Sequence, residues 1–208
     1  MKKVVIIGAG PHSKVIIDIL TERSEYEIVG LTDQNPEGFV LGYKVLGTDE
    51  ILLELKHNGV EAAFVALGNN RVRKKMFDYA NGLGFEMINA ISQNAIISRF
   101  VKLGKGLAIM PGAVINASSM IGNGCIINTN ASIDHDCRVS DFVHIAPGCA
   151  VSGSTSIGEG SFLGTGSRVI DKINIGKNVL VGSGGVVVKD IADNCEVVGI
   201  PATVIKSI

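Results

Sequence analysis

A six-residue repeat of aliphatic residues occupies the C-terminal half of this 208-residue chain. In steps of six from Ile97 to Val187, all sixteen positions are Val, Ile or Leu. A step of six matches neither the 3.6-residue period of a helix nor the alternation of an isolated strand, but it fits one short strand plus one turn. Three such segments close a triangular coil around the aliphatic residues, and stacked coils pair their strands in parallel. The repeat therefore predicts a parallel β-helix of about five coils.

Two further positions follow the same period. Residues two places before each aliphatic site are mostly small, and they include Cys125, Cys137 and Cys149. We expect these cysteines in the core of the coil and expect no metal site. Glycine recurs directly after the aliphatic site, where we expect it to supply turn conformations that a side chain would hinder. These glycines are Gly104, Gly122, Gly158, Gly164, Gly176 and Gly182.

Composition argues against several partners. Nineteen Lys and Arg residues against twenty Asp and Glu residues give a net charge of -1, which provides no sequence-wide positive field for nucleic acid or an anionic membrane. Gly8 and Pro11 break the first apolar run too early for a signal peptide, and no other segment resembles a membrane span. The four cysteines are too few for a disulfide scaffold. We therefore expect a cytoplasmic protein.

The N-terminal third is expected to alternate strands and helices. Apolar strands are predicted at 4–7, 28–31 and 62–67, and helices at 14–20, at 48–57 with Thr48 as the cap, and at 71–80. This alternation is typical of a small parallel sheet. The predicted organisation is an α/β Rossmann-like domain at 1–90, an all-β parallel helix of hexapeptide repeats at 91–192, and a C-terminal cap at 193–208. The cap begins where the six-residue step lands on Asp193.

A glycine turn after the first strand suggests a nucleotide site. Gly8 and Gly10 precede a helix, and Asp33 ends the second strand, which is the layout of a dinucleotide-binding unit. Ser13 replaces the third glycine of that fingerprint, so binding of a nucleotide diphosphate is favoured over binding of NAD. Amides at the start of the helix can hold a diphosphate, and Asp33 can accept hydrogen bonds from ribose or base.

Several short segments carry a family resemblance over the full length of the chain. They are Gly8-Ala9-Gly10-Pro11-His12-Ser13-Lys14, Gly68-Asn69-Asn70 with Arg73-Lys74-Lys75, Asn128 with His135-Asp136, His144, and Gly199-Ile200-Pro201-Ala202. Together with the repeat, they resemble the hexapeptide-repeat sugar O- and N-acetyltransferases of the sialic acid and bacillosamine pathways. The resemblance implies a left-handed β-helix that forms a homotrimer, acetyl-CoA in the groove between neighbouring subunits, and a nucleotide-linked sugar on the N-terminal domain. The substrate-binding residues it implies are Gly8, Gly10, His12, Ser13, Asp33, Gly68 and Asn69.

The expected chemistry needs a base, because a sugar amine is largely protonated near neutral pH. His135 lies two residues beyond the interior Ile133 on the outward side of the coil, and its ordinary pKa of about 6.5 suits proton transfer. The resemblance implies that His135 is the general base. Asp136 or Asp134 can accept from its other ring nitrogen and stabilise the imidazolium. Many N-acetyltransferase relatives have Glu after this histidine, whereas this chain has Asp136.

Other residues are assigned by their place on the coil or by the resemblance. His144 also points outward and can donate to the acetyl carbonyl or to substrate; the alternative is packing at the trimer interface. Asn128 is expected to orient the sugar or the base, and Gly153 aligns with a backbone amide that meets the thioester oxygen. The coenzyme A groove is expected to include Gly164, Thr165, Gly182 and Ser183, with Lys189 or Lys206 at the phosphates. The run Arg73-Lys74-Lys75 is interpreted as an exposed helix surface.

The leading hypothesis is acetyl-CoA-dependent N-acetylation of the amine of a nucleotide-linked amino sugar, of the 4-amino-4,6-dideoxy type, in the synthesis of a glycan. The alternative within the same class is O-acetylation of sialic acid or a related sugar. A zinc hydratase on the same β-helix would need three histidines across a subunit boundary, and only His135 and His144 lie in the repeat. A nicotinamide-binding regulator is disfavoured by Ser13.

Overall fold

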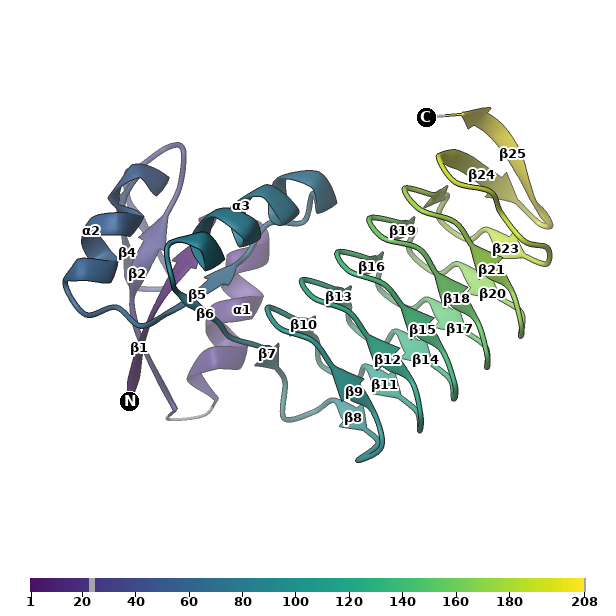
Figure 1. Cartoon of the computed structure of the whole chain (residues 1–208), viewed down its shortest axis with the longest axis horizontal. Coiled ribbons are helices and arrows are strands. Elements are labelled where there is room, and N and C mark those ends of the chain that lie inside the picture. The colour runs from purple at the N-terminus through teal and green to yellow at the C-terminus, as the bar shows by residue number, and fades with distance from the viewer. Residues whose placement is uncertain (23–24, 208) are drawn as a thin grey trace. The chain divides into compact units, whose positions relative to one another are not determined.

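The computed structural model describes residues 1–22 and 25–207, and the chain divides into two compact units, Met1–Gln93 and Asn94–Ile208. The first is an α/β unit and the second is a coil of short strands, as Figure 1 shows by colour and label. The predicted Rossmann-like domain and left-handed parallel β-helix are confirmed.

The first unit contains a mostly parallel sheet with strand order β3-β4-β2-β1-β5-β6. Strands β1, β2, β4, β5 and β6 pair in parallel, whereas the short β3 pairs antiparallel with β4. Of these strands, β3, β4 and β6 were not predicted. The strands of this unit are β1 (Lys2–Ile7), β2 (Tyr26–Thr32), β3 (Phe39–Val40), β4 (Tyr43–Gly47), β5 (Ala62–Val65), β6 (Glu86–Met87) and β7 (Ala90–Ile91). The helices are α1 (Pro11–Thr21), α2 (Leu52–His57), which follows a 3-10 turn (Asp49–Ile51), and α3 (Asn70–Gly82).

Three helix starts show how local chemistry sets the element boundaries. Thr48 occupies the N-cap position, as predicted, but its side chain makes no capping hydrogen bond, and the Ile51 amide donates to the Thr48 carbonyl instead (3.2 Å). Helix α3 does have a side-chain cap: the Asn69 Oδ1 accepts from the Val72 amide at 3.0 Å. Helix α1 begins at Pro11, whose ring fixes a helical φ where no amide donor is needed.

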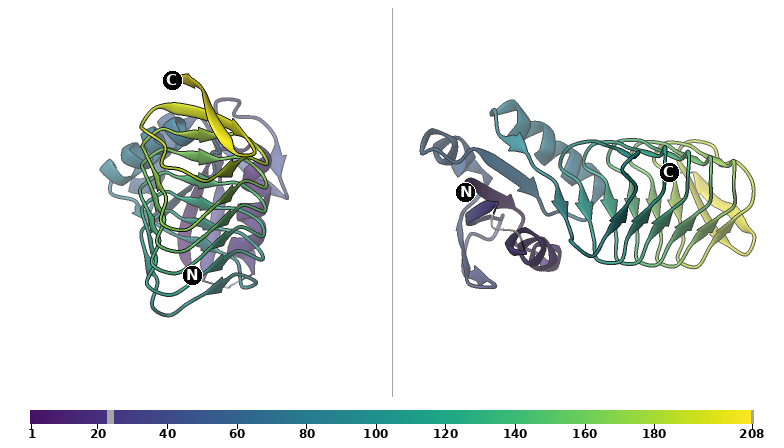
Figure 2. Two further views of the ribbon diagram at one scale, coloured as in Figure 1. Left: turned by 90° about the vertical axis from the view of Figure 1, so that its right-hand side faces the viewer. Right: turned by 90° about the horizontal axis from the view of Figure 1, so that it is seen from below.

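The second unit is a coil with three faces, and successive strands of one face are eighteen residues apart, as predicted. Figure 2 shows its turns stacked one upon another. One face holds β10 (Ala108–Ile109), β13 (Ile126–Ile127), β16 (His144–Ile145), β19 (Phe162–Leu163), β22 (Leu180–Val181), β24 (Cys195–Gly199) and β25 (Ala202–Ser207). The next holds β8 (Ile96–Ile97), β11 (Val114–Ile115), β14 (Ser132–Ile133), β17 (Ala150–Val151), β20 (Arg168–Val169) and β23 (Val186–Val187). The third holds β9 (Lys102–Leu103), β12 (Met120–Ile121), β15 (Arg138–Val139), β18 (Ser156–Ile157) and β21 (Asn174–Ile175).

The aliphatic series forms the core of this coil. From Ile109 to Val187 every member of the series is buried, and only Ile97 and Leu103 in the first coil are half-buried. The three cysteines expected inside are buried as well, at 0%, 0% and 1% exposure for Cys125, Cys137 and Cys149. The core therefore has the composition that the period predicted.

The glycines that follow the aliphatic residues have a different role from the one expected. The left-handed turn conformation falls two places later, at positions such as Gly124 (φ 60°) and Asp136 (φ 60°). At Gly158, by contrast, an added Cβ would lie 2.5–2.6 Å from backbone atoms of Gly176 and Lys177 in the next coil. This position is glycine because consecutive coils approach too closely for a side chain.

The six-residue step fails at Asp193 because one turn is shortened. Ile191 forms a parallel bridge with Ile175, and β24 pairs in parallel with β22, with Val197 opposite Val181. The offset between these partners is sixteen residues instead of eighteen. The region predicted as a cap thus contains one strand that continues the coil and a second, β25, that returns antiparallel to it.

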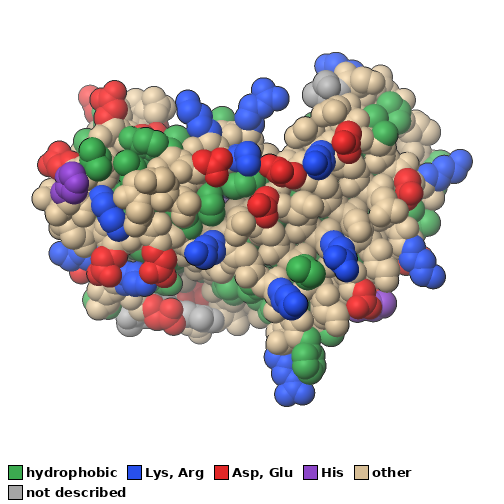
Figure 3. Space-filling model, in the orientation of Figure 1, with side chains coloured by type: hydrophobic (Ala, Val, Ile, Leu, Met, Phe, Trp, Pro, Cys, Tyr) green, Lys and Arg blue, Asp and Glu red, His purple; other side chains and the backbone are tan. Residues whose placement is uncertain are grey.

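The surface carries charges of both signs. On the face drawn in Figure 3, basic and acidic side chains are interspersed, in keeping with the net charge of -1. Within the described residues, no helix is both long and apolar enough to cross a membrane.

Candidate active site

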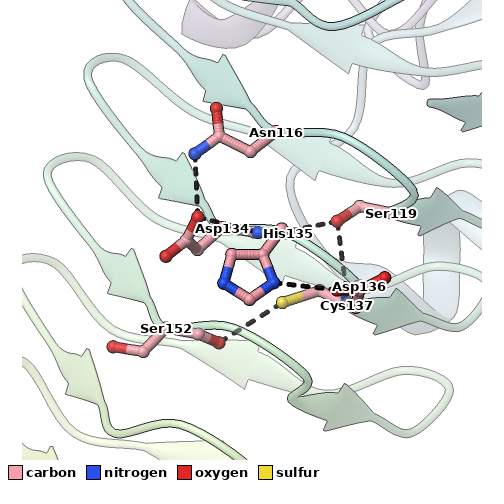
Figure 4. A network of polar contacts seen from close by, with 7 residues as sticks. All are labelled: Asn116, Ser119, Asp134, His135, Asp136, Cys137 and Ser152. Atoms are coloured by element: carbon pink, nitrogen blue, oxygen red, sulfur yellow. Dashed lines mark hydrogen bonds and ion pairs between the residues drawn. The ribbon is translucent and has the colours of Figure 1, made fainter. Parts of the chain in front are cut away.

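The turn after β14 holds His135 and Asp136 close together. Their side chains are 58% and 59% exposed, and the His135 Nδ1 lies 2.8 Å from the Asp136 Oδ2 (Figure 4). Asp136 has the left-handed φ of the turn, which Asp tolerates better than longer side chains do. When Nδ1 donates to this carboxylate, the neutral ring carries its lone pair on Nε2. That is the state a general base requires.

The backbone of His135 is also held in place. Its amide donates to the Asp134 Oδ1 at 2.8 Å, and the same oxygen accepts from the Asn116 Nδ2 at 2.9 Å. These two hydrogen bonds, with the Asn116 bond contributing most, lower the pKa of Asp134. Asn116 lies one coil earlier, and the eighteen-residue spacing of Asn116 and Asp134 is the sequence signal that would have identified this pair.

Two carboxylates raise the pKa of His135 above its ordinary value. The hydrogen bond to Asp136 is the larger cause, and the charge of Asp134 adds to it. The imidazolium is therefore stabilised in the way that the sequence led us to expect of these two residues.

Gly153, one coil after His135, lies against the imidazole ring. A Cβ added at Gly153 would lie 2.7 Å from His135 Cε1 and 2.8 Å from Nε2. The ring thus rests on a position where only glycine leaves room for it.

Substitution Gly153→Ala is expected to lower turnover about 10- to 100-fold, because the new methyl group displaces the ring from its position. The thermal unfolding midpoint should change little, since His135 is exposed and can move aside. Steady-state kinetics together with thermal unfolding will check both expectations. Wild-type turnover in Gly153→Ala would show that the ring position is unimportant.

His144 and Asn128 form a second polar pair. The Asn128 Nδ2 lies 3.1 Å from the His144 Nε2, and the Phe162 ring meets the imidazole edge-on with centroids 4.9 Å apart. His144 is half-buried on the outer side of β16, and Phe162 is its partner in β19. Packing by Phe162 and a polar partner together fix the orientation of the ring.

The predicted site residues of the coil fall at different corners. The "His135 corner" consists of the turns at 116–119, 134–137, 152–155 and 170–173, and the "Asn128 corner" of those at 128–131, 146–149, 164–167 and 182–185. Gly153 lies at the first corner. Gly164, Thr165, Gly182 and Ser183 lie at the second, where the Thr165 carbonyl accepts from the Gly184 amide at 2.8 Å. Lys189 is exposed beyond β23, away from the Asn128 corner.

The glycine turn of the first unit is arranged around Asp33. The Asp33 Oδ2 accepts from the Ala9 amide at 2.7 Å. Gly8 has a φ of 103° and is backed by Leu67, whereas Gly10 is exposed and has open space where a Cβ would lie. The buried Ser13 hydroxyl donates to the Gly10 carbonyl at 2.7 Å. The structure therefore brings four of the predicted substrate residues together.

His12 lies behind this turn, close to Arg73. Burial, with the charge of Arg73 as a second cause, lowers the pKa of His12 to about 4, so the imidazole is neutral at pH 7. Among the described residues, none hydrogen-bonds to its buried Nε2. The interpretation of Arg73 as a surface residue is wrong: it is 1% exposed, whereas Lys74 and Lys75 are exposed.

Arg73 supports the loop that contains Gly68 and Asn69. Its Nη1 donates to the carbonyls of Leu67 and Gly68, both at 3.0 Å, and its Nη2 donates to the Asn70 Oδ1 at 2.7 Å. Gly68 is exposed with open space around it, and Asn69 caps α3. The guanidinium is buried because it donates to consecutive loop carbonyls that need donors. The charge of the residue alone does not predict these contacts.

A shallow pocket beside the His135 turn was also missed. Met120 in β12 lies between Lys102 in β9 and Arg138 in β15, and all three residues line this pocket. Arg138 is two residues after Asp136. Lys102 and Arg138 are suited to bind phosphate oxygens. Their spacing of two coils is the signal that places them on one face.

Comparison with known proteins adds to this geometry. A family model described as the PglD N-terminal domain matches residues 3–80. The chain is similar to the perosamine N-acetyltransferase of Caulobacter crescentus, solved with CoA and GDP-perosamine, at 44% identity and a TM-score of 0.96 over 98% of this chain and 97% of that chain. It is similar to the acetyltransferase domain of PglB from Neisseria gonorrhoeae, solved with acetyl coenzyme A, at 38% identity and a TM-score of 0.94 over 98% and 99%.

Curated sequences give a shorter match. Over 113 residues the chain is 39% identical to the UDP-N-acetylbacillosamine N-acetyltransferase of Bacillus subtilis, covering 53% of this chain and 52% of that protein. The chain therefore spans about half the length of this curated relative.

Proposed function

Because this chain belongs to the family of hexapeptide-repeat sugar acetyltransferases that includes the perosamine N-acetyltransferase of Caulobacter crescentus, we propose that it transfers an acetyl group from acetyl-CoA to the amine of a nucleotide-linked amino sugar. The observation that carries the proposal is the hydrogen-bonded pair of His135 and Asp136 at 2.8 Å, with the His135 ring seated on Gly153. A 4-amino-4,6-dideoxy sugar is the proposed acceptor. Perosamine, which the Caulobacter enzyme binds as its GDP derivative, is the precedent.

His135 Nε2 removes the proton from the sugar ammonium as its nitrogen attacks the thioester carbonyl, and Asp136 stabilises the imidazolium. The Gly153 amide is the proposed donor to the oxygen that becomes negative, because a preorganised donor lowers the barrier. Collapse of the intermediate expels the coenzyme A thiolate. The nitrogen loses two protons in going from ammonium to amide: the thiolate takes up one, and the other is released to solvent. The reaction is a direct transfer, with no acetyl group attached to the enzyme.

A homotrimer is the proposed active assembly. His135 and Gly153 lie at one corner of the coil, whereas Asn128 and the predicted coenzyme A residues lie at another. A threefold arrangement of coils brings the first corner of one subunit beside the second corner of the next, so that acetyl-CoA binds in the groove between them. Asn128 and His144 then orient the substrate or the acetyl carbonyl from across the interface.

The nucleotide is proposed to bind to the turn of Gly8, Gly10, His12 and Ser13, with Asp33 at the ribose or base and Gly68 and Asn69 on the facing loop. The amides at the start of α1 are available to its phosphates. Acetyl-CoA and nucleotide sugars are substrates of cytoplasmic glycan assembly, and we place the reaction there.

The decisive experiment measures thiol release from acetyl-CoA with a panel of UDP-, dTDP- and GDP-linked amino sugars and with free and CMP-linked sialic acid. We expect release with at least one 4-amino sugar, and an N-acetyl product by mass spectrometry. Release only with sialic acid would replace this proposal by O-acetylation. No release with any acceptor would overturn it.

The raised pKa of His135 predicts a pH dependence. Since the base acts in its neutral form, kcat/KM is expected to rise with pH through a midpoint above 6.5. In Asp136→Asn the main cause of the raised pKa is lost, and the midpoint should move down towards 6.5. The difference between the two profiles is independent of the pKa of the sugar amine, and coincident midpoints would contradict the role given to Asp136.

A further inference from the structure

A buried hydroxyl in the coil before His135 joins the two ends of the His135 turn. Ser119 is 0% exposed. Its Oγ donates to the Asp134 carbonyl at 2.7 Å and accepts from the Cys137 amide at 3.1 Å. Figure 4 shows dashed lines from the Ser119 hydroxyl to both residues, with the His135 ring on the turn between them. Ser119 therefore fixes both backbone ends of the turn without touching the ring.

This arrangement arises because Ser119 occupies the small interior position of the repeat, two residues before the aliphatic site. The Cys137 thiol donates to the Ser152 carbonyl fifteen residues later, and the Thr155 hydroxyl donates to the Ile170 carbonyl at 3.2 Å. Each small polar residue thus satisfies a carbonyl at the start of the next turn, which burial would otherwise leave without a donor. The Ser119 hydroxyl also accepts from the Cys137 amide, so it holds two points of the turn.

Ser161 reproduces the same arrangement far from the proposed chemistry. It is 0% exposed, its Oγ donates to the Gly176 carbonyl at 2.8 Å, and it accepts from the Val179 amide at 3.0 Å. Ser161 lies at the third corner of the coil, formed by the turns at 122–125, 140–143, 158–161 and 176–179. That corner holds none of the residues assigned to substrate, coenzyme A or catalysis. Ser161 therefore provides a control: a buried serine with the same pair of hydrogen bonds that lies away from the proposed site.

We propose that Ser119 is a positioning residue for the acetyl transfer, which holds the His135 turn so that the ring remains on Gly153 and within hydrogen-bond distance of Asp136. The inference rests on the proposed function of His135 as base. It goes beyond that function because it assigns the geometry of the base to a residue in another coil.

The first test does not depend on activity. In the full-length protein labelled with [13Cε1]histidine, the pKa of His135 is measured by NMR, with His135→Gln used to assign its signal. Ser119→Ala is expected to lower the pKa of His135 towards 6.5. In a turn that Ser119 no longer holds, Nδ1 spends less time beside Asp136 and the ring lies farther from Asp134. Ser161→Ala, which loses the same two hydrogen bonds, should leave it unchanged. Equal pKa values in the two variants would overturn the proposal.

The second test separates positioning from folding. Ser119→Ala is expected to lower kcat about tenfold with the KM of both substrates within about twofold of wild type, as for a small misplacement of a reacting group. Ser119→Thr should restore most of kcat, because Thr155 shows that this interior position accepts threonine and its hydroxyl bond. Ser161→Ala should lose comparable thermal stability yet keep kcat within about twofold. A kcat loss as large in Ser161→Ala as in Ser119→Ala would reduce Ser119 to a structural role.

The two proposals fail in different ways. Absence of acetyl transfer by the wild-type protein would remove the proposed function, while the NMR comparison would still decide whether Ser119 controls His135. Normal transfer with equal effects of the two serine variants would remove only the role of Ser119.

Discussion

Replacing His135 with Gln is expected to lower kcat for acetyl transfer about a thousandfold, within the range typical of a lost general base. Glutamine can still bond to Asp136 but cannot take up the proton of the sugar ammonium. The measurement is thiol release from acetyl-CoA at saturating nucleotide sugar. The residual rate of His135→Gln should rise with pH about tenfold per unit up to the pKa of the amine, because the substrate must then lose its proton to water.

His57→Gln provides the matched control, since His57 is an exposed residue at the end of α2 and belongs to none of the proposed sites. It should retain wild-type kcat. His144→Gln should have an intermediate effect, because His144 is proposed to orient a reacting group instead of removing the proton. A loss in His144→Gln that exceeds the loss in His135→Gln would transfer the role of base to His144.

Gly158→Ala is expected to destabilise the β-helix by about 3 kcal/mol, the upper part of the range for overpacking. Its Cβ would lie within 2.6 Å of the Gly176 carbonyl carbon and oxygen and the Lys177 amide, all of them backbone atoms. The Gly158 amide is hydrogen-bonded to the Ile175 carbonyl at 2.8 Å, so the coils cannot separate without breaking the ladder. The thermal midpoint should fall by roughly 6–12 °C at fixed protein concentration.

Gly166→Asn tests a glycine of the other kind. Gly166 has a φ of 71° and open space where a Cβ would lie, and Asn130 and Asn178 adopt the same left-handed conformation at equivalent places. Because asparagine tolerates this conformation, the change should alter stability by about 0.5 kcal/mol or less. Equal destabilisation by the two substitutions would contradict the distinction between coil-packing and turn glycines.

The period of the sequence was sufficient to predict the coil, its three faces and its buried cysteines. It could not assign the glycines correctly, because Gly158 is required by an atom of the next coil and not by its own dihedral angles. The pattern also did not predict that Ser119 hydrogen-bonds to another coil. It requires only a small residue at that position and does not distinguish a hydroxyl from a methyl group. The six-residue pattern therefore predicts which residues share a face or a corner of the coil, but not the close contacts and hydrogen bonds that they make with the next coil.

The candidate site shows the same division. His135 and Asp136 were identified from the resemblance, and their contact at 2.8 Å follows from adjacency and a turn conformation that Asp can adopt. Arg73 was misread because a run of three basic residues on a helix usually faces solvent. Its burial depends on the carbonyls of Leu67 and Gly68, whose direction only the folded loop determines.

The stacked coil also restricts how the length of this chain can change. Since each face returns every eighteen residues, an insertion of eighteen residues adds one complete turn and leaves all later faces in phase. An insertion of six residues between His135 and Gly153 would still satisfy the aliphatic core, but it would rotate every later residue by one corner. Gly153 would then no longer lie against the imidazole ring. The fold therefore tolerates insertions of six residues, which are a third of a turn of the coil. The site tolerates only insertions of eighteen residues, and only outside the interval between His135 and Gly153.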